Sequence, residues 1–173
     1  MSEALREELQ QNQDAPQQET NMPSMAWHRF LVRFLLFLLP ACALFQIWEI
    51  ATGRIYHSTA AREAIYAGIR GMWALDLALC LLLLGEAVLM LLARGKLKRL
   101  RREGARLLLA GHGLAALAWM LYGLSRLLIA GLSPLSVSVA GQCATNLILL
   151  LVNRSYYARR EGIWLDCGEG SKQ

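Results

Sequence analysis

Long apolar blocks constrain this chain more than any other feature. From about residue 34 to residue 152 they are long enough to cross a bilayer, and block 71–93 holds only two charged residues, Asp76 and Glu86. A helix over its 23 residues spans about 34 Å, against roughly 30 Å for the hydrocarbon core. The chain is also 55% hydrophobic and only 18% charged, unlike typical soluble domains. We therefore predict an all-α integral membrane protein.

The apolar blocks predict a single transmembrane domain over residues 27–152. Its four helices are expected at about 34–51, 71–93, 105–130 and 134–152. Pro40 lies inside the first and is expected to bend it, because proline removes a helical hydrogen bond. The residues Gly131-Leu132-Ser133-Pro134 predict a tight turn before the fourth helix. Ser58 or Thr59 is expected to cap a short helix over residues 60–68 in the longer connection.

Both flanking segments differ from this domain. Residues 1–26 are polar and Gln-rich, with too few apolar side chains to offset the entropy of ordering, so we predict a disordered cytoplasmic tail. Residues 153–173 are basic at first and then acidic, and we predict a second cytoplasmic tail there.

The basic residues predict the orientation of the helices. Of the 18 Lys and Arg residues, fourteen fall on one side of the predicted membrane: Arg6, Arg29, Arg33, Arg94, Lys96, Lys98, Arg99, Arg101, Arg102, Arg106, Arg154, Arg159, Arg160 and Lys172. The other side holds Arg54, Arg62, Arg70 and Arg126. The positive-inside rule then places both termini in the cytoplasm, with the helices in the plasma membrane.

Polar residues inside the predicted spans are the best candidates for function, since each is costly in the bilayer. The candidates are Asp76, Glu86, His112, Arg126, Gln142 and Asn146. Counting residues along the helices places Glu86, His112 and Asn146 at one depth, roughly 9–10 Å from the cytoplasmic end, where we expect a polar layer. Asp76 and Arg126 share a depth near the opposite end, which predicts an ion pair.

Two interpretations of these residues remain open. In the first, the polar residues form interhelical hydrogen bonds that hold the bundle together. Alternatively, Glu86 and His112 form a proton or ligand site, because a carboxylate and an imidazole can exchange protons near neutral pH.

The basic loop after the second predicted helix is the strongest charge feature. Its basic residues are Arg94, Lys96, Lys98, Arg99, Arg101 and Arg102. A basic loop is expected on the cytoplasmic side even if its only role is to fix the orientation of the helices. Its side chains are also candidates for contact with anionic lipid headgroups. We expect no nucleic-acid binding, because no recognition fold or aromatic platform accompanies the charge.

We expect no metal, no cofactor and no enzymatic activity. His28, His57 and His112 fall at three different levels, and no Cys-x-x-Cys motif occurs. No nucleophile with a partner base is apparent.

The last predicted helix ends in Asn153-Arg154-Ser155-Tyr156-Tyr157-Ala158-Arg159-Arg160, followed by Trp164. With Ile65-Tyr66, Asp76 and the basic loop, this ending resembles small four-helix membrane proteins of Gram-positive bacteria. The resemblance covers about residues 34–164. It implies a bacterial four-helix topology and no mechanism.

These patterns favour a non-enzymatic membrane protein that acts by interaction or assembly, as a homo-oligomer or with another membrane protein. The alternative is a small oligomeric transporter or channel lined by Glu86, His112, Gln142 and Asn146. Small multidrug transporters share the helix number but carry their working carboxylate in the first helix. Here Gln46 and Glu49 lie too near the outer end for that role.

Overall fold

The computed structural model describes residues 25–130 and 137–164, and within them every regular element is a helix. The long helices are α3 (Leu36–Ala51), α5 (Met72–Leu97), α6 (Arg102–Ala130) and α7 (Val137–Ala158). The shorter elements are α2 (Ala26–Phe30), the π-helical turn η1 (Leu31–Leu35), α4 (Thr59–Gly68) and the 3₁₀ turns η2 (Arg54–Tyr56) and η3 (Glu161–Ile163).

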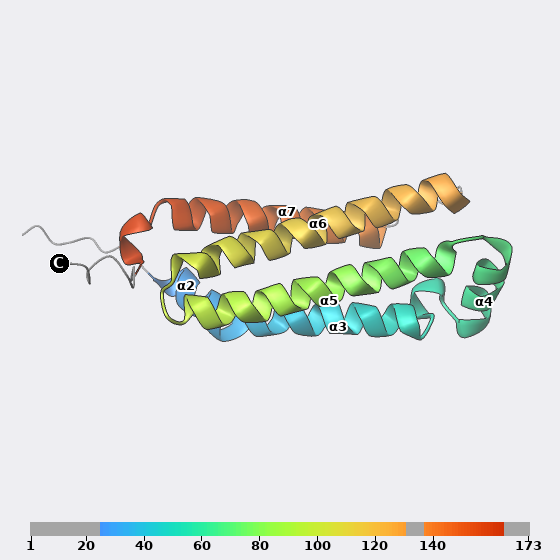
Figure 1. The fold of residues 1–173 in the computed structure, drawn as a ribbon, viewed down its shortest axis with the longest axis horizontal. Helices are drawn as coiled ribbons and strands as arrows, with labels where there is room; N and C mark the ends of the chain where they lie inside the picture. Colours follow the sequence, from blue (N-terminus) through green and yellow to red (C-terminus); the bar gives the residue numbers. More distant parts are fainter. Residues whose placement is uncertain (1–24, 131–136, 165–173) are drawn as a thin grey trace, which may run out of the picture.

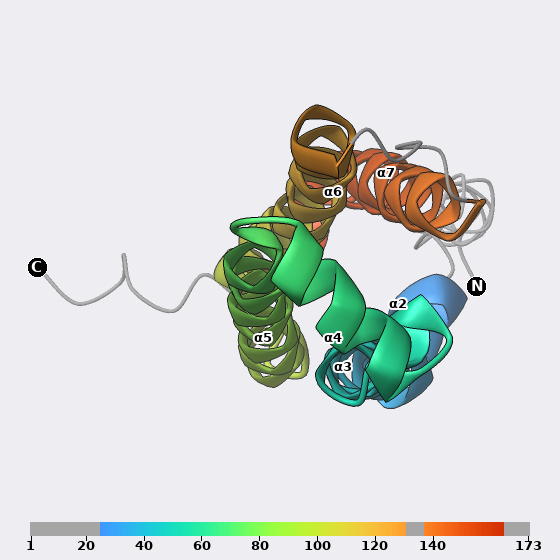
Figure 2. The ribbon, with the colours of Figure 1, turned by 90° about the vertical axis from the view of Figure 1, so that its right-hand side faces the viewer.

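The four long helices run side by side in the order α3, α5, α6, α7 (Figure 1). Helix α4 lies across one end, which we call the α4 end, and α2 lies at the other, the α2 end. Seen along the bundle, the helices form a ring that is open between α3 and α7 (Figure 2). Helices α3 and α7 thus each rest on the α5–α6 pair rather than on one another.

In the described part of the chain, three helical segments are long and apolar enough to cross a membrane: Ala26–Ala51, Met72–Leu97 and Arg102–Ile129. This finding supports the prediction of a membrane protein. Helix α7 is not among them, because Ser138, Gln142, Asn146 and Asn153 interrupt its apolar residues.

The helices extend beyond the apolar blocks that predicted them. The first begins at Ala26 rather than residue 34, the second continues to Leu97, and the third begins at Arg102. Helix α7 continues through residues 153–158, which the sequence assigned to a tail. The apolar run marks only the part suited to hydrocarbon, whereas the backbone hydrogen bonds continue into residues suited to the headgroup layer. Residues 1–24, the predicted turn at residues 131–134 and residues 165–173 lie outside the described part of the chain.

Pro40 perturbs the first helical segment upstream of itself. A proline ring clashes with the carbonyl four residues earlier, which here belongs to Leu36, and Leu36 departs from helical geometry with φ −75° and ψ 4°. The π-helical turn η1 immediately precedes it. The Val32 carbonyl in this turn accepts a hydrogen bond of 3.1 Å from Nε of Arg94, so α5 supports the distorted segment.

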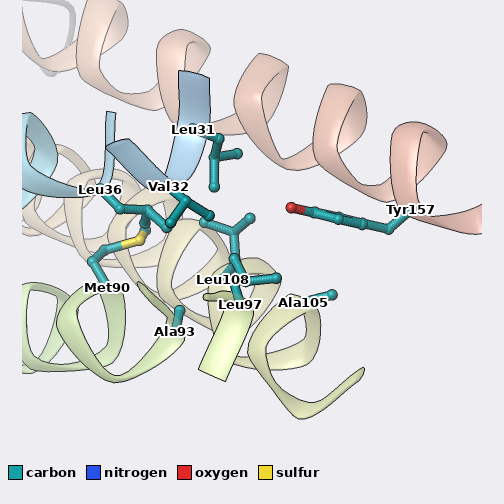
Figure 3. Packing of buried hydrophobic residues seen from close by; sticks show 9 residues of the cluster. All are labelled: Leu31, Val32, Leu36, Met90, Ala93, Leu97, Ala105, Leu108 and Tyr157. Carbon is teal, nitrogen blue, oxygen red and sulfur yellow. The ribbon is translucent and has the colours of Figure 1, made fainter. Parts of the chain in front are cut away.

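Helices α5 and α6 approach closely because α6 presents glycines to α5. A Cβ at Gly104 would lie 2.7 Å from the Leu97 backbone nitrogen, and one at Gly111 would lie 2.8 Å from Cε of Met90. Leu97 and Met90 belong to the buried cluster at the α2 end, which also takes in Leu31 and Tyr157 (Figure 3). Small residues of this kind allow helices to pack without a gain from the hydrophobic effect.

The short helix in the longer connection is confirmed. It is α4, and Oγ of Ser58 accepts a hydrogen bond of 3.0 Å from the Ala61 amide, as expected of an N-cap.

Candidate functional site

Glu86 lies inside the bundle. It follows Leu79 and Leu83 and precedes Met90 on the buried side of α5, and only 6% of its surface is exposed. Within the described residues its carboxylate has no hydrogen-bond or ion-pair partner. Buried charged groups are normally paired, so Glu86 requires an explanation.

Glu86 lines a cavity of about 510 Å³ between α3 and α7, together with residues of both helices. Its polar lining residues are Gln46 and Glu49 on α3, Glu86 on α5, and Gln142, Thr145 and Asn146 on α7. Phe45, Cys42 and Thr145 are also exposed on the surface of the bundle, so the cavity opens sideways. We call this cavity the α3–α7 cleft.

A hydrogen-bonded chain of buried groups supports the α7 wall of the cleft. Nδ1 of His112 donates to Oδ1 of Asn146 at 3.2 Å, and Nε2 accepts from Nδ2 of Asn153 at 3.5 Å. Nδ2 of Asn146 in turn donates to the Gln142 carbonyl at 3.0 Å. Both ring nitrogens of His112 are therefore occupied, and its partners are asparagines rather than Glu86.

Beyond the cleft, at the α2 end of the bundle, α2 contacts α7. Nε1 of Trp27 donates to Oδ1 of Asn153 at 3.0 Å, and Nδ1 of His28 lies 3.1 Å from the Tyr157 hydroxyl. The ring of Tyr157 also lies against Trp164, with ring centroids 5.3 Å apart. These contacts join the two sides of the open ring at this end.

Asp76 has entirely different surroundings at the α4 end. Its carboxylate is 2% exposed and accepts three tyrosine hydrogen bonds: from Tyr56 at 2.7 Å, from Tyr66 at 2.6 Å and from Tyr122 at 2.9 Å. These residues, which we call the Asp76 cluster, bring together η2, α4, α5 and α6. Burial, reinforced by the hydrogen bonds, raises the pKa of the Tyr56 and Tyr66 hydroxyls, so both stay protonated as donors.

The predicted ion pair between Asp76 and Arg126 is wrong. Lys96 and Glu103 form an ion pair at 2.5 Å, whereas Asp76 and Arg126, both among the described residues, do not. The Arg126 guanidinium instead lies 5.6 Å from the ring centre of Tyr122 and 5.9 Å from that of Tyr56. Two residues at one depth need not meet, because aromatic side chains can stand between them.

Two residues of the predicted lipid-contact loop are engaged within the protein. Arg94 bonds the Val32 carbonyl and lies 3.7 Å from the centre of the Phe37 ring, and Lys96 pairs with Glu103. Lys98, Arg99 and Arg102 are exposed, and Arg101 is half-buried.

The described residues contain no group of three or more His, Cys, Asp or Glu side chains that could hold a metal ion. Cys42, Cys80 and Cys143 are free thiols.

The structure thus unites Glu86, Gln142 and Asn146 in one cleft and places His112 behind them, while Asp76 lies in a separate cluster. Sequence reasoning missed the three tyrosines around Asp76 and assigned no role in a site to Gln46 or Glu49. A polar stripe on the first helix, Gln46 and Glu49 three residues apart, was the signal for the α3 wall.

Comparison of the chain with protein-family models, with curated proteins and with solved structures finds no match.

Proposed function

We propose that this protein is a non-enzymatic membrane protein that acts by binding, and that the α3–α7 cleft is its binding site. In this proposal α7 is a fourth span and the α2 end faces the cytoplasm. The occupant enters sideways from the bilayer.

The distribution of charge and polarity supports the fourth span. The α2 end carries the basic loop and the basic residues that follow α7, as the positive-inside rule requires for a cytoplasmic face. Helix α7 has 22 residues, enough to cross the hydrocarbon core. Its polar residues Gln142, Thr145 and Asn146 line the cleft, and polar groups in spans usually face such cavities.

A single observation carries the binding role: Glu86 is a buried carboxylate that has no partner among the described residues and lines an open cavity. Groups that only hold helices together are bonded to other helices, as Asp76 is. A cavity of about 510 Å³ also lies within the range of about 300–1,000 Å³ typical of ligand sites.

Transport through the cleft is the alternative. It would require the α2 end to open, and that end is closed by Trp27, Asn153, His28 and Tyr157. The closed end favours binding over transport.

The native Cys42 offers a direct test, because it lines the cleft and is exposed. With Cys80 and Cys143 changed to Ala and Cys167 to Ser, Cys42 is the sole thiol. In lipid vesicles, a bilayer-soluble maleimide should label it. Thr145→Trp on the opposite wall should slow labelling by about tenfold, whereas Leu117→Trp, on an exposed part of α6, should not.

Equal rates of Cys42 labelling in the two tryptophan variants would contradict the proposal that the cleft is a binding site. The same sole-thiol protein separates binding from transport. Labelling of Cys42 by a membrane-impermeant maleimide from both sides of the vesicle would favour transport, and labelling from one side or neither supports binding.

A further inference from the structure

The charge of the α3–α7 cleft identifies the chemistry of its occupant. Two of its lining residues are acidic, Glu86 and Glu49, and none of the residues that line it is basic. This contrasts with the chain as a whole, whose formal net charge is +5. A carboxylate in a low-dielectric site is strongly destabilised unless a positive charge approaches it. The cleft is therefore electrostatically complementary to a cation.

Other residues of the cleft determine what kind of cation it can hold. Leu39, Ala43 and Phe45 supply apolar and aromatic surface, and a phenyl ring attracts cations through its face. The side-chain amides of Gln46 and Gln142 make no hydrogen bond within the described part of the chain, so their carbonyls are available to N–H groups of a ligand. A hydrated metal ion would gain little from such a wall, whereas an organic cation would contact all of it.

We propose that the α3–α7 cleft binds a lipophilic organic cation, with Glu86 as its counter-ion and Glu49 adding negative potential nearer the α4 end. This inference rests on the proposed binding role and specifies its ligand class. The sideways opening suits a molecule that reaches the site from the bilayer, with its apolar body against α3 and its charge toward α5.

The experiment uses two probes of nearly the same size and shape but opposite charge, tetraphenylphosphonium and tetraphenylborate. The full chain is reconstituted in phosphatidylcholine nanodiscs, and binding is measured by equilibrium dialysis against protein-free nanodiscs. Tetraphenylphosphonium should bind saturably and should protect Cys42 from the maleimide. Tetraphenylborate should do neither.

Variants locate the binding to the cleft. Glu86→Gln should weaken tetraphenylphosphonium binding by about tenfold or more, because it removes the buried partner charge, and Glu49→Gln should weaken it less. Glu63→Gln, on the exposed surface of α4, removes the same charge outside the cleft and should leave affinity within about twofold of the original. Thr145→Trp should abolish binding while keeping both carboxylates, which covers the case in which Glu86→Gln fails to fold.

Three results would overturn the inference: equal binding of both probes, unchanged affinity in Glu86→Gln, or no protection of Cys42 by tetraphenylphosphonium. Each leaves the proposed binding role intact if Thr145→Trp still slows the labelling of Cys42. Loss of that tryptophan effect would instead contradict the proposed function itself.

Discussion

Asp76 and Glu86 are both acidic residues on α5, both buried, and only ten residues apart. Asp76 accepts hydrogen bonds from tyrosines of three other elements. Glu86 accepts none within the described residues and lines a cavity. Burial alone therefore does not distinguish a carboxylate that is bonded within the protein from one that lines a cavity.

The difference lies in what satisfies each charge. Three hydroxyl donors compensate for the desolvation of Asp76, so its burial stabilises the α4 end. No group in the described part of the chain does this for Glu86, so its burial costs stability unless a ligand or a proton arrives. Stability should respond to one residue and binding to the other.

The largest expected effect on stability is that of Asp76→Ala. It removes three charge-assisted hydrogen bonds and leaves buried tyrosine hydroxyls without an acceptor. We expect the free energy of unfolding to fall by about 2–4 kcal/mol, measured by reversible unfolding in mixed micelles. Ligand affinity should not change in the fraction that remains folded. A fall below about 1 kcal/mol would contradict the structural role of the Asp76 cluster.

An intermediate effect is expected for His112→Ala. The substitution removes the partner of both Asn146 and Asn153, and interhelical hydrogen bonds in membranes average about 0.6 kcal/mol each. We expect a loss of about 1–2 kcal/mol in unfolding free energy by the same measurement. His57→Asn, in an exposed connection outside the long helices, is the control and should cost less than about 0.5 kcal/mol, because asparagine tolerates the left-handed backbone at this position, where φ is 70°. Equal losses in the two variants would show that the buried hydrogen bonds contribute nothing.

The smallest expected effect is that of Glu86→Gln. The amide keeps the shape of the side chain and removes the charge, so the free energy of unfolding should stay constant or rise by up to about 1 kcal/mol. A loss comparable to that of Asp76→Ala would mean that Glu86 has a structural partner, and the contrast between the two carboxylates would fail.

Features that depend on nearby residues could be predicted from the sequence. The apolar blocks predicted the long helices, and the expected cap at Ser58 or Thr59 located the start of α4, where Ser58 is the N-cap. Counting along the helices placed His112 and Asn146 at one depth, where they form a hydrogen bond, because the rise of a helix is uniform.

Features that depend on the rotation of helices and on side-chain direction could not be predicted from the sequence. Depth alone paired Asp76 with Arg126, whereas the hydroxyls of Tyr56, Tyr66 and Tyr122 reach Asp76 from three separate elements. Asn153 lay beyond the apolar run, so nothing in the pattern placed it opposite Trp27. The polar stripe of Gln46 and Glu49 indicated one wall of the cleft, but the separation of α3 from α7 that opens it depends on how the helices are arranged.

The open ring also affects how the protein assembles. The connection between α5 and α6 is short, and the glycines of α6 hold the pair in close contact, so this hairpin can form from local contacts. Helices α3 and α7 each then pack on a surface that already exists. Neither depends on the other for most of its length, so contacts between them do not fix the order in which they dock, and the α2 contacts to α7 require both to be in place.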